Sequence, residues 1–166
     1  MTPEHFGLAP SGAMPNHPDF PVLVYRGAVP GSGEAAAAAI EALFERNGWP
    51  PAWRNGIYAF HHYHTLGHEA LGCARGTARV LLGGPGGREV EIGASDVLVL
   101  PAGTGHCRIA ASPDFLVIGA YPPGQRADIC REAPTPDMLA RIRALPAPAT
   151  DPTGSTEGLT RLWRPS

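Results

Sequence analysis

The sequence predicts one domain of mainly β structure, a barrel of short strands with an N-terminal helix and a short C-terminal helix. The 166 residues include 21 glycines and 19 prolines, and 43% of the residues are hydrophobic. This balance is typical of many short strands joined by tight turns, because a disordered chain has fewer hydrophobic residues. We expect the domain, 1–166, to comprise an N-terminal arm, strand and helix (1–55), a barrel core (56–121), and a C-terminal helix and tail (122–166).

The N-terminal region should form an extended arm, one strand and one helix. Residues 1–20 are rich in proline, and the apolar segment 22–25, with two valines and a tyrosine, predicts the first strand. Ser32 is a suitable N-cap for a helix through Arg46. Apolar residues recur along this segment at helical spacing, and Gly48 should stop the helix.

The barrel core should contain seven short strands. The pattern predicts them at 57–63, 69–73, 77–82, 88–92, 97–100, 106–109 and 115–121. The glycine-rich loop 83–87 should join two of them as a hairpin. Residues 97–100 are apolar on both faces, which is expected of a strand buried on both sides.

The C-terminal region should contain a second, short helix and a tail. Thr135 followed by Pro136 is typical of a helix start, and Pro146 should end this helix after Leu145. Residues 147–166 form a tail rich in proline and glycine. We expect the apolar segment 159–163 to fix this tail to the body of the domain.

Charge and cysteine content limit the function classes. The net charge is −2, the pI is near 6.4, and no run of lysine and arginine occurs, which disfavours nucleic acid and anionic membranes as partners. The N-terminus lacks the features of a signal peptide, and no apolar run approaches the ~20 residues of a membrane span. Three cysteines without a C-x-x-C spacing indicate a reducing compartment, and we expect the cytoplasm.

The segment 56–76 holds the most informative pattern in the chain. His62 and His64 are two residues apart, so on a strand both point to the same face and can reach one metal ion. Glu69 follows after a turn for which Gly67 supplies the backbone freedom. We expect Glu69 to return on the partner strand of a hairpin, opposite the histidines. Two histidines and a carboxylate are typical of mononuclear iron and manganese sites.

A second segment supplies a fourth candidate ligand. An apolar strand ends at Pro101-Ala-Gly103, and His106 opens the next strand. The two segments resemble the paired motifs of the cupin superfamily. The first motif is matched at all five defined positions: Gly56, His62, His64, Glu69 and Gly76. The second is matched at Pro101, Gly103 and His106, whereas Ser95 and Ala110 replace its glycine and asparagine. The resemblance implies a jelly-roll barrel, or double-stranded β-helix, in which His62, His64, Glu69 and His106 bind one metal.

The wider outline is similar to a group of uncharacterised single-domain bacterial cupins. The shared features are the strand at 21–25, the helix after Ser32, the segment from His61 to His64, and Tyr121-Pro-Pro-Gly-Gln125. This resemblance implies a fold and a metal site but no substrate.

Two neighbouring histidines are alternatives to consider. His61 should point away from the metal, because it faces the opposite side of the strand from His62. His68 would replace Glu69 as third ligand if the turn were one residue shorter. His64 and His68 also have the spacing of a helical metal site, but Gly67 and the β-rich residues before it argue against a helix.

Further residues should line a substrate pocket. Tyr58, Phe60 and Leu71 share the strand face of the ligands, although packing in the core is their simpler role. Arg108 shares the face of His106 and would bind an anionic group at the cavity mouth, unless it is an ordinary surface arginine. Gln125, after the last strand, is a candidate lid contact.

These patterns favour a metal-dependent enzyme that acts on a small metabolite, a mononuclear dioxygenase above all. The cofactor would be one divalent transition metal, Fe, Mn, Ni or Zn, because the same ligands suit each of them. The alternatives are a metal-dependent isomerase or lyase, and a non-catalytic cupin that binds a small ligand. We also expect a homodimer, because the apolar strand at 22–25 on its arm can cap its own barrel or pair with a second copy.

Overall fold

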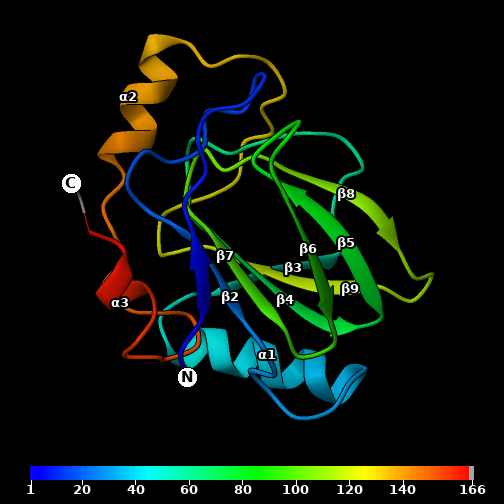
Figure 1. Cartoon of the computed structure of the whole chain (residues 1–166). Helices are drawn as coiled ribbons and strands as arrows, with labels where there is room; N and C mark the ends of the chain where they lie inside the picture. The colour runs from blue at the N-terminus through cyan, green and yellow to red at the C-terminus, as the bar shows by residue number, and fades with distance from the viewer. Residues whose placement is uncertain (165–166) are drawn as a thin grey trace.

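The structure, a computed structural model, describes residues 1–164 and confirms the predicted fold class. Two antiparallel sheets face each other, and helices lie outside them (Figure 1). The elements are β1 Glu4–Phe6, β2 Val22–Tyr25, α1 Glu34–Arg46, β3 Pro51–Asn55, β4 Glu69–Arg75, β5 Thr77–Leu82, β6 Arg88–Gly93, β7 Val97–Leu100, β8 His106–Ala111, β9 Leu116–Ala120, α2 Pro136–Ala144 and α3 Leu159–Leu162.

One sheet has six strands in the order β1-β2-β7-β4-β9-β3, and the other has three in the order β6-β5-β8. In the larger sheet, Leu71 of β4 lies opposite Leu98 of β7 and Gly119 of β9. In the smaller sheet, Val80 of β5 lies opposite Arg108 of β8. The loop 83–87 joins β5 to β6 as the predicted hairpin.

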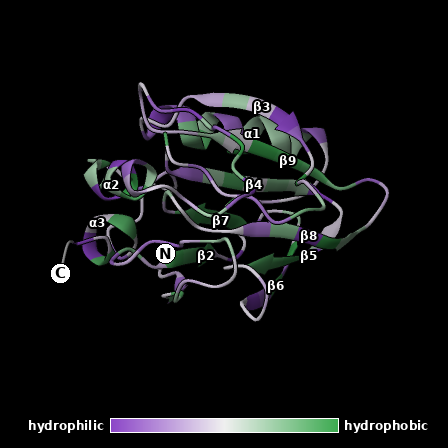
Figure 2. Ribbon diagram, turned by 90° about the horizontal axis from the view of Figure 1, so that it is seen from above, coloured by the Kyte–Doolittle hydropathy of each residue, from purple (hydrophilic) through white to green (hydrophobic). Residues whose placement is uncertain are grey.

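Strand β7 of the larger sheet is buried on both faces, as predicted for the apolar segment 97–100. Leu98 and Leu100 of β7 belong to the core between the two sheets. Val97 and Val99 point the other way, into a second core that includes Ile40 of α1. Figure 2 shows α1 beside β3 and β9, with the three-stranded sheet on the opposite side. Alternation along each strand therefore separates the barrel interior from the layer under α1.

The two predicted helices are present, but the N-cap predicted for the first of them is wrong. The N-cap of α1 is Gly33, not Ser32, and no side chain caps this end. Gly33 adopts a φ of 75°, which favours glycine, and its N–H donates to the Ala74 carbonyl of β4. Attachment to the sheet therefore fixes the helix start. The second helix, α2, begins as predicted, with the Thr135 hydroxyl accepting from the Met138 N–H.

Two strands were missed, and the predicted strand at 57–63 is wrong. In that segment, only His62 and Tyr63 make isolated bridges, to His106 and Cys130. The strand lies earlier, at Pro51–Asn55 (β3), on the edge of the larger sheet. The N-terminal arm contains β1, which pairs with β2, and β2 pairs with β7 of its own barrel.

The C-terminal tail is attached to the barrel, as expected. Leu159 and Trp163 are buried, and the Trp163 indole stacks on Phe20 at a centroid distance of 5.1 Å. The indole N–H also donates to the Pro21 carbonyl at 2.8 Å. Figure 1 shows α2 and α3 on the same side of the barrel. Across residues 1–164, every helix is too short or too polar to cross a bilayer.

Candidate metal centre

Three predicted ligands, His62, His64 and His106, come together between the sheets. Their side chains are buried, and one nitrogen of each lies within 4.8 Å of those of the other two, so the cluster can hold a metal ion. His106 opens β8, and the bridge between His62 and His106 joins the loop that carries His62 to that strand. The rings of this pair are 3.9 Å apart.

Each imidazole is oriented by a backbone carbonyl at its Nδ1. The acceptors are Phe60 for His62 at 2.9 Å, Asp128 for His64 at 2.5 Å, and Thr104 for His106 at 2.9 Å. A carbonyl can only accept, so Nδ1 carries the proton and Nε2 keeps its lone pair in the neutral ring. This is the tautomer that a histidine needs for binding a metal through Nε2.

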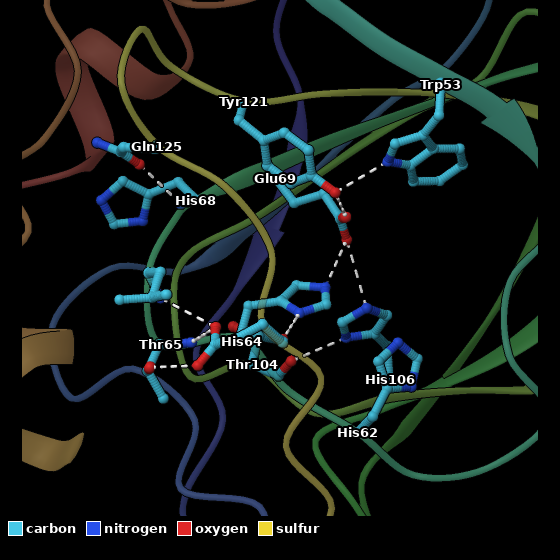
Figure 3. A network of polar contacts seen from close by, with 12 residues as sticks. Trp53, His62, His64, Thr65, His68, Glu69, Thr104, His106, Tyr121 and Gln125 are labelled. Carbon is cyan, nitrogen blue, oxygen red and sulfur yellow. Dashed lines mark hydrogen bonds and ion pairs between the residues drawn. The ribbon is translucent and has the colours of Figure 1, made fainter.

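Glu69 completes the cluster from the opposite sheet. One carboxylate oxygen lies 3.2 Å from His64 Nε2 and 3.3 Å from His106 Nε2. The second oxygen accepts a hydrogen bond of 2.9 Å from the Tyr121 hydroxyl. Figure 3 shows Glu69 between Tyr121 and the imidazoles. The predicted hairpin is wrong, because β4, which begins at Glu69, pairs with β7 and β9 rather than with the histidine segment.

Burial and mutual charge set the protonation of this cluster. Burial, reinforced by His106, lowers the pKa of His62 to about 3, so this ring is neutral near pH 7. Burial opposes ionisation of Glu69, but His64 and His106 outweigh it and lower the pKa of its carboxyl. Burial alone would lower the pKa of His64, whereas the Glu69 carboxylate raises it. A metal cation would replace a proton as the partner of Glu69.

The donor set fits a divalent transition metal. Three neutral imidazole nitrogens and one carboxylate oxygen suit iron, manganese, nickel and zinc alike. A buried carboxylate that faces two imidazole nitrogens is costly unless a cation neutralises it.

Two residues that support Glu69 were not predicted. The Tyr121 hydroxyl donates to Glu69 and accepts from the Trp53 indole N–H, each at 2.9 Å. Tyr121 directly follows β9, and Trp53 lies in β3. Tyr121 was noted only as part of a shared sequence outline, and no local pattern ties either residue to the metal ligands.

Asp128 is a third residue that the sequence did not reveal. Besides orienting His64 through its carbonyl, its carboxylate accepts from the Thr65 N–H at 2.7 Å, the Thr65 hydroxyl at 2.5 Å and the Leu66 N–H at 3.1 Å. Asp128 therefore holds the turn that follows His64 in place. No motif links residues 64 and 128.

A cavity of about 470 Å³ opens onto the cluster. Three of the predicted pocket residues, Tyr58, Leu71 and Arg108, line this cavity. The fourth, Phe60, is not part of the lining. Its ring stacks on Tyr58 at 4.8 Å, and the Arg131 guanidinium lies 4.0 Å from its centroid. Phe60 thus supports the cavity wall from behind.

His68 has a structural environment of its own. Its Nδ1 accepts from the Ala102 N–H at 2.9 Å, and its Nε2 donates to the Pro146 carbonyl at 3.0 Å. The predicted lid contact, Gln125, instead accepts from the His68 N–H at 2.9 Å. In Figure 3, His68 lies beside Gln125, away from the three imidazoles. Neither His68 nor His61 belongs to the histidine cluster.

Replacing His68 by leucine should destabilise the fold and leave metal binding intact. The change removes two hydrogen bonds and leaves the Ala102 N–H and the Pro146 carbonyl without their partner. We expect a loss of about 2 kcal/mol in the free energy of unfolding. Chemical denaturation and metal content measure the two effects. Loss of the metal from a folded His68→Leu protein would contradict the separation of His68 from the site.

Replacing Tyr121 by phenylalanine should weaken metal binding about tenfold, because residues that support a ligand typically contribute that much or more. Glu69 loses one hydrogen bond, and the Trp53 N–H loses its acceptor. Competition with a chelator of known affinity measures the change. Tyr58→Phe is the matched control, since Tyr58 lines the same cavity without bonding to Glu69. Equal affinities of the two variants would argue against this role of Tyr121.

Comparison with known proteins places the chain in a family. No protein-family model matches it. Over 155 residues it is 38% identical to the uncharacterized protein YjlB of Bacillus subtilis, and the alignment covers 92% of this chain and 91% of that protein. The chain belongs to the YjlB family. A DUF861 family protein of Thermotoga maritima with a crystal structure is 16% identical, with a TM-score of 0.35, over 59% of this chain and 96% of that one. The two-sheet fold and buried histidines of this YjlB family member agree with the cupin resemblance of its sequence.

Proposed function

We propose that this protein is a cupin metalloenzyme that uses one divalent transition metal to transform a small metabolite, with oxygenase chemistry as the main candidate. The ligands are His62, His64, Glu69 and His106. The observation that carries the proposal is the common orientation of the three imidazoles. Each Nδ1 is bonded to a carbonyl, which directs the Nε2 atoms into one buried space beside a carboxylate.

The residues around this space favour a catalytic metal over a purely structural one. Four protein ligands leave coordination positions open on a metal that prefers six, and the cavity adjoins them. Iron bound there would supply the redox chemistry for reaction with O2. The protein would orient the substrate, and the buried side chains of Leu71 and Ile57 would exclude water from one wall of the cavity.

A redox-neutral isomerase or lyase is the second candidate. Such chemistry requires a group that carries a proton next to the substrate. The Tyr121 hydroxyl lines the cavity and lies 2.9 Å from the Glu69 carboxylate, which favours this alternative. A binding protein without turnover is the third possibility, and the experiment below separates all three.

The decisive experiment combines metal analysis with a search for turnover. Protein purified without added metal is analysed for Fe, Mn, Ni and Zn, then loaded anaerobically with iron and tested for O2 uptake with small metabolites. Uptake that requires both iron and a metabolite supports the oxygenase. Turnover without O2 supports the isomerase or lyase. A metal that stays bound through a wide substrate screen without turnover would favour the binding protein, and failure to bind any metal would refute the proposal.

We further propose that the protein is cytoplasmic, belongs with the uncharacterised single-domain bacterial cupins, and forms a homodimer. The six-stranded sheet ends at β1, whose outer edge can pair with a second copy. Light scattering of the intact chain, and of a chain that begins after β1, tests the dimer. The intact chain should have twice the mass of a monomer, and a monomeric intact chain would contradict this proposal.

A further inference from the structure

Arg108 is a half-buried cation at the cavity, and no acidic side chain of the described residues pairs with it. It follows His106 by two residues on β8, so both side chains leave the same face of the strand. Arg108 lies opposite Val80, a residue of the core between the sheets, and it lines the cavity. Among residues 1–164, its guanidinium has neither an ion pair nor a hydrogen bond. By contrast, Arg79 of the adjacent strand pairs with Glu89 at 3.2 Å.

The charge of the cavity favours an anion. Glu69 is the acidic residue of the lining, and it already faces His64, His106 and Tyr121. The positive charge of a divalent cation and Arg108 together would therefore exceed the single negative charge of the Glu69 carboxylate. At the rim, the Asn55 side-chain oxygen accepts from the Gly56 N–H at 2.8 Å, which leaves its amide N–H groups to donate to a ligand.

The remaining walls favour an apolar body. Leu71 and Ile57 are buried in the cavity wall. Tyr58 and Ile129, which also line it, are 51% and 47% exposed. Large apolar side chains around a concave site are typical of small-molecule sites, and about 470 Å³ is within their usual size.

We propose that the cavity binds a small organic carboxylate. Its carboxylate pairs with Arg108, its apolar or aromatic body lies against Tyr58, Leu71 and Ile129, and its opposite end faces the three histidines. Residues two apart on a strand are separated by about 7 Å, so a molecule of one ring can reach from Arg108 to the cluster above His106. The inference rests on the proposed function, because the metal provides the second polar contact.

The test compares matched acids and amides as probes. Salicylate and benzoate, with salicylamide and benzamide, are titrated into the iron-loaded protein by calorimetry and thermal melting. We expect the acids to bind about tenfold or more tightly than the amides, because a bidentate arginine–carboxylate pair is a strong, charge-assisted contact. Arg108→Gln should remove this preference while it retains the metal. Arg79→Gln removes the same charge from the outer face of the same sheet, and this variant should keep the preference for acids over amides.

The outcomes separate this inference from the proposed function. Absence of binding by both acids up to the solubility limit, or equal binding of acids and amides, overturns the carboxylate site while the metal site stands. Acid binding that survives Arg108→Gln places the carboxylate elsewhere, for example on the metal, and also overturns the inference. Failure of the native protein to bind any metal refutes the proposed function instead, and titration of the metal-free protein then tests Arg108 by itself.

Discussion

Replacing His64 by alanine should lower metal affinity by about a thousandfold or more, which corresponds to about 4 kcal/mol. Its imidazole is one of the three that converge, and the Asp128 carbonyl at 2.5 Å fixes its orientation. Removing a ligand should cost more than the 10–100-fold typical of a residue that only supports one. We expect losses of the same order for His62→Ala, His106→Ala and Glu69→Ala, measured by metal content and by competition with a chelator.

His61→Ala is the matched control, because His61 is the immediate neighbour of His62 and lies outside the histidine cluster. Its metal affinity should equal that of the native protein. Circular dichroism of each variant shows whether a loss of metal reflects unfolding. If Glu69→Ala keeps the metal and His68→Ala loses it, the proposed ligand set is incorrect at its third position.

The sequence predicted correctly which histidines lie together, but it did not predict the backbone structure that brings them together. The spacing of His62 and His64 and the turn before His106 indicated a shared site, and the structure brings these three histidines together. The two-residue spacing predicted one strand for His62 and His64, whereas that segment forms only isolated bridges. The cupin-like motif identified the residues that converge, whereas the strand predicted from their spacing is absent.

Pairing between distant segments explains what the sequence could not show. Glu69 was expected in a hairpin with the histidines, but its strand is held between β7 and β9 of the opposite sheet. Sequence spacing reports on neighbours along the chain, and these strand partners lie many residues away. Asp128 was missed for the same reason, since its contacts with His64 and Thr65 join segments more than 60 residues apart.

The strand β3 was missed because its residues are not typical of strands. Pro51 begins it, which an edge strand tolerates because proline cannot donate to a partner. Trp53 then lies opposite Gly119 of β9, and its indole reaches the Tyr121 hydroxyl. The position of Trp53 therefore depends on the lack of a side chain at Gly119, whereas strand propensities count a glycine only as unfavourable.

Replacing Gly119 by alanine should destabilise the protein and disturb the metal site together. A methyl group at this position would lie 2.1 Å from Cε2 and 2.2 Å from Cζ2 of Trp53, so the indole must move. Its movement breaks the hydrogen bond to Tyr121 and thereby weakens the support of Glu69. We expect a loss of roughly 1–3 kcal/mol in the free energy of unfolding. Metal affinity should fall about tenfold, as for Tyr121→Phe.

A double-mutant cycle with Trp53→Ala tests this mechanism. Without the indole the three atoms nearest to the added methyl are gone, so Gly119→Ala in the Trp53→Ala background should cost little further stability or affinity. Gly93→Ala is the control for adding a methyl to a strand glycine, because its nearest neighbour, Thr77 Cγ2, would lie at 3.7 Å, an ordinary contact. Additive effects of Gly119→Ala and Trp53→Ala would mean that the indole does not transmit the change. Strong coupling would show that a glycine of the sheet positions Trp53, and through Tyr121 the carboxylate of Glu69.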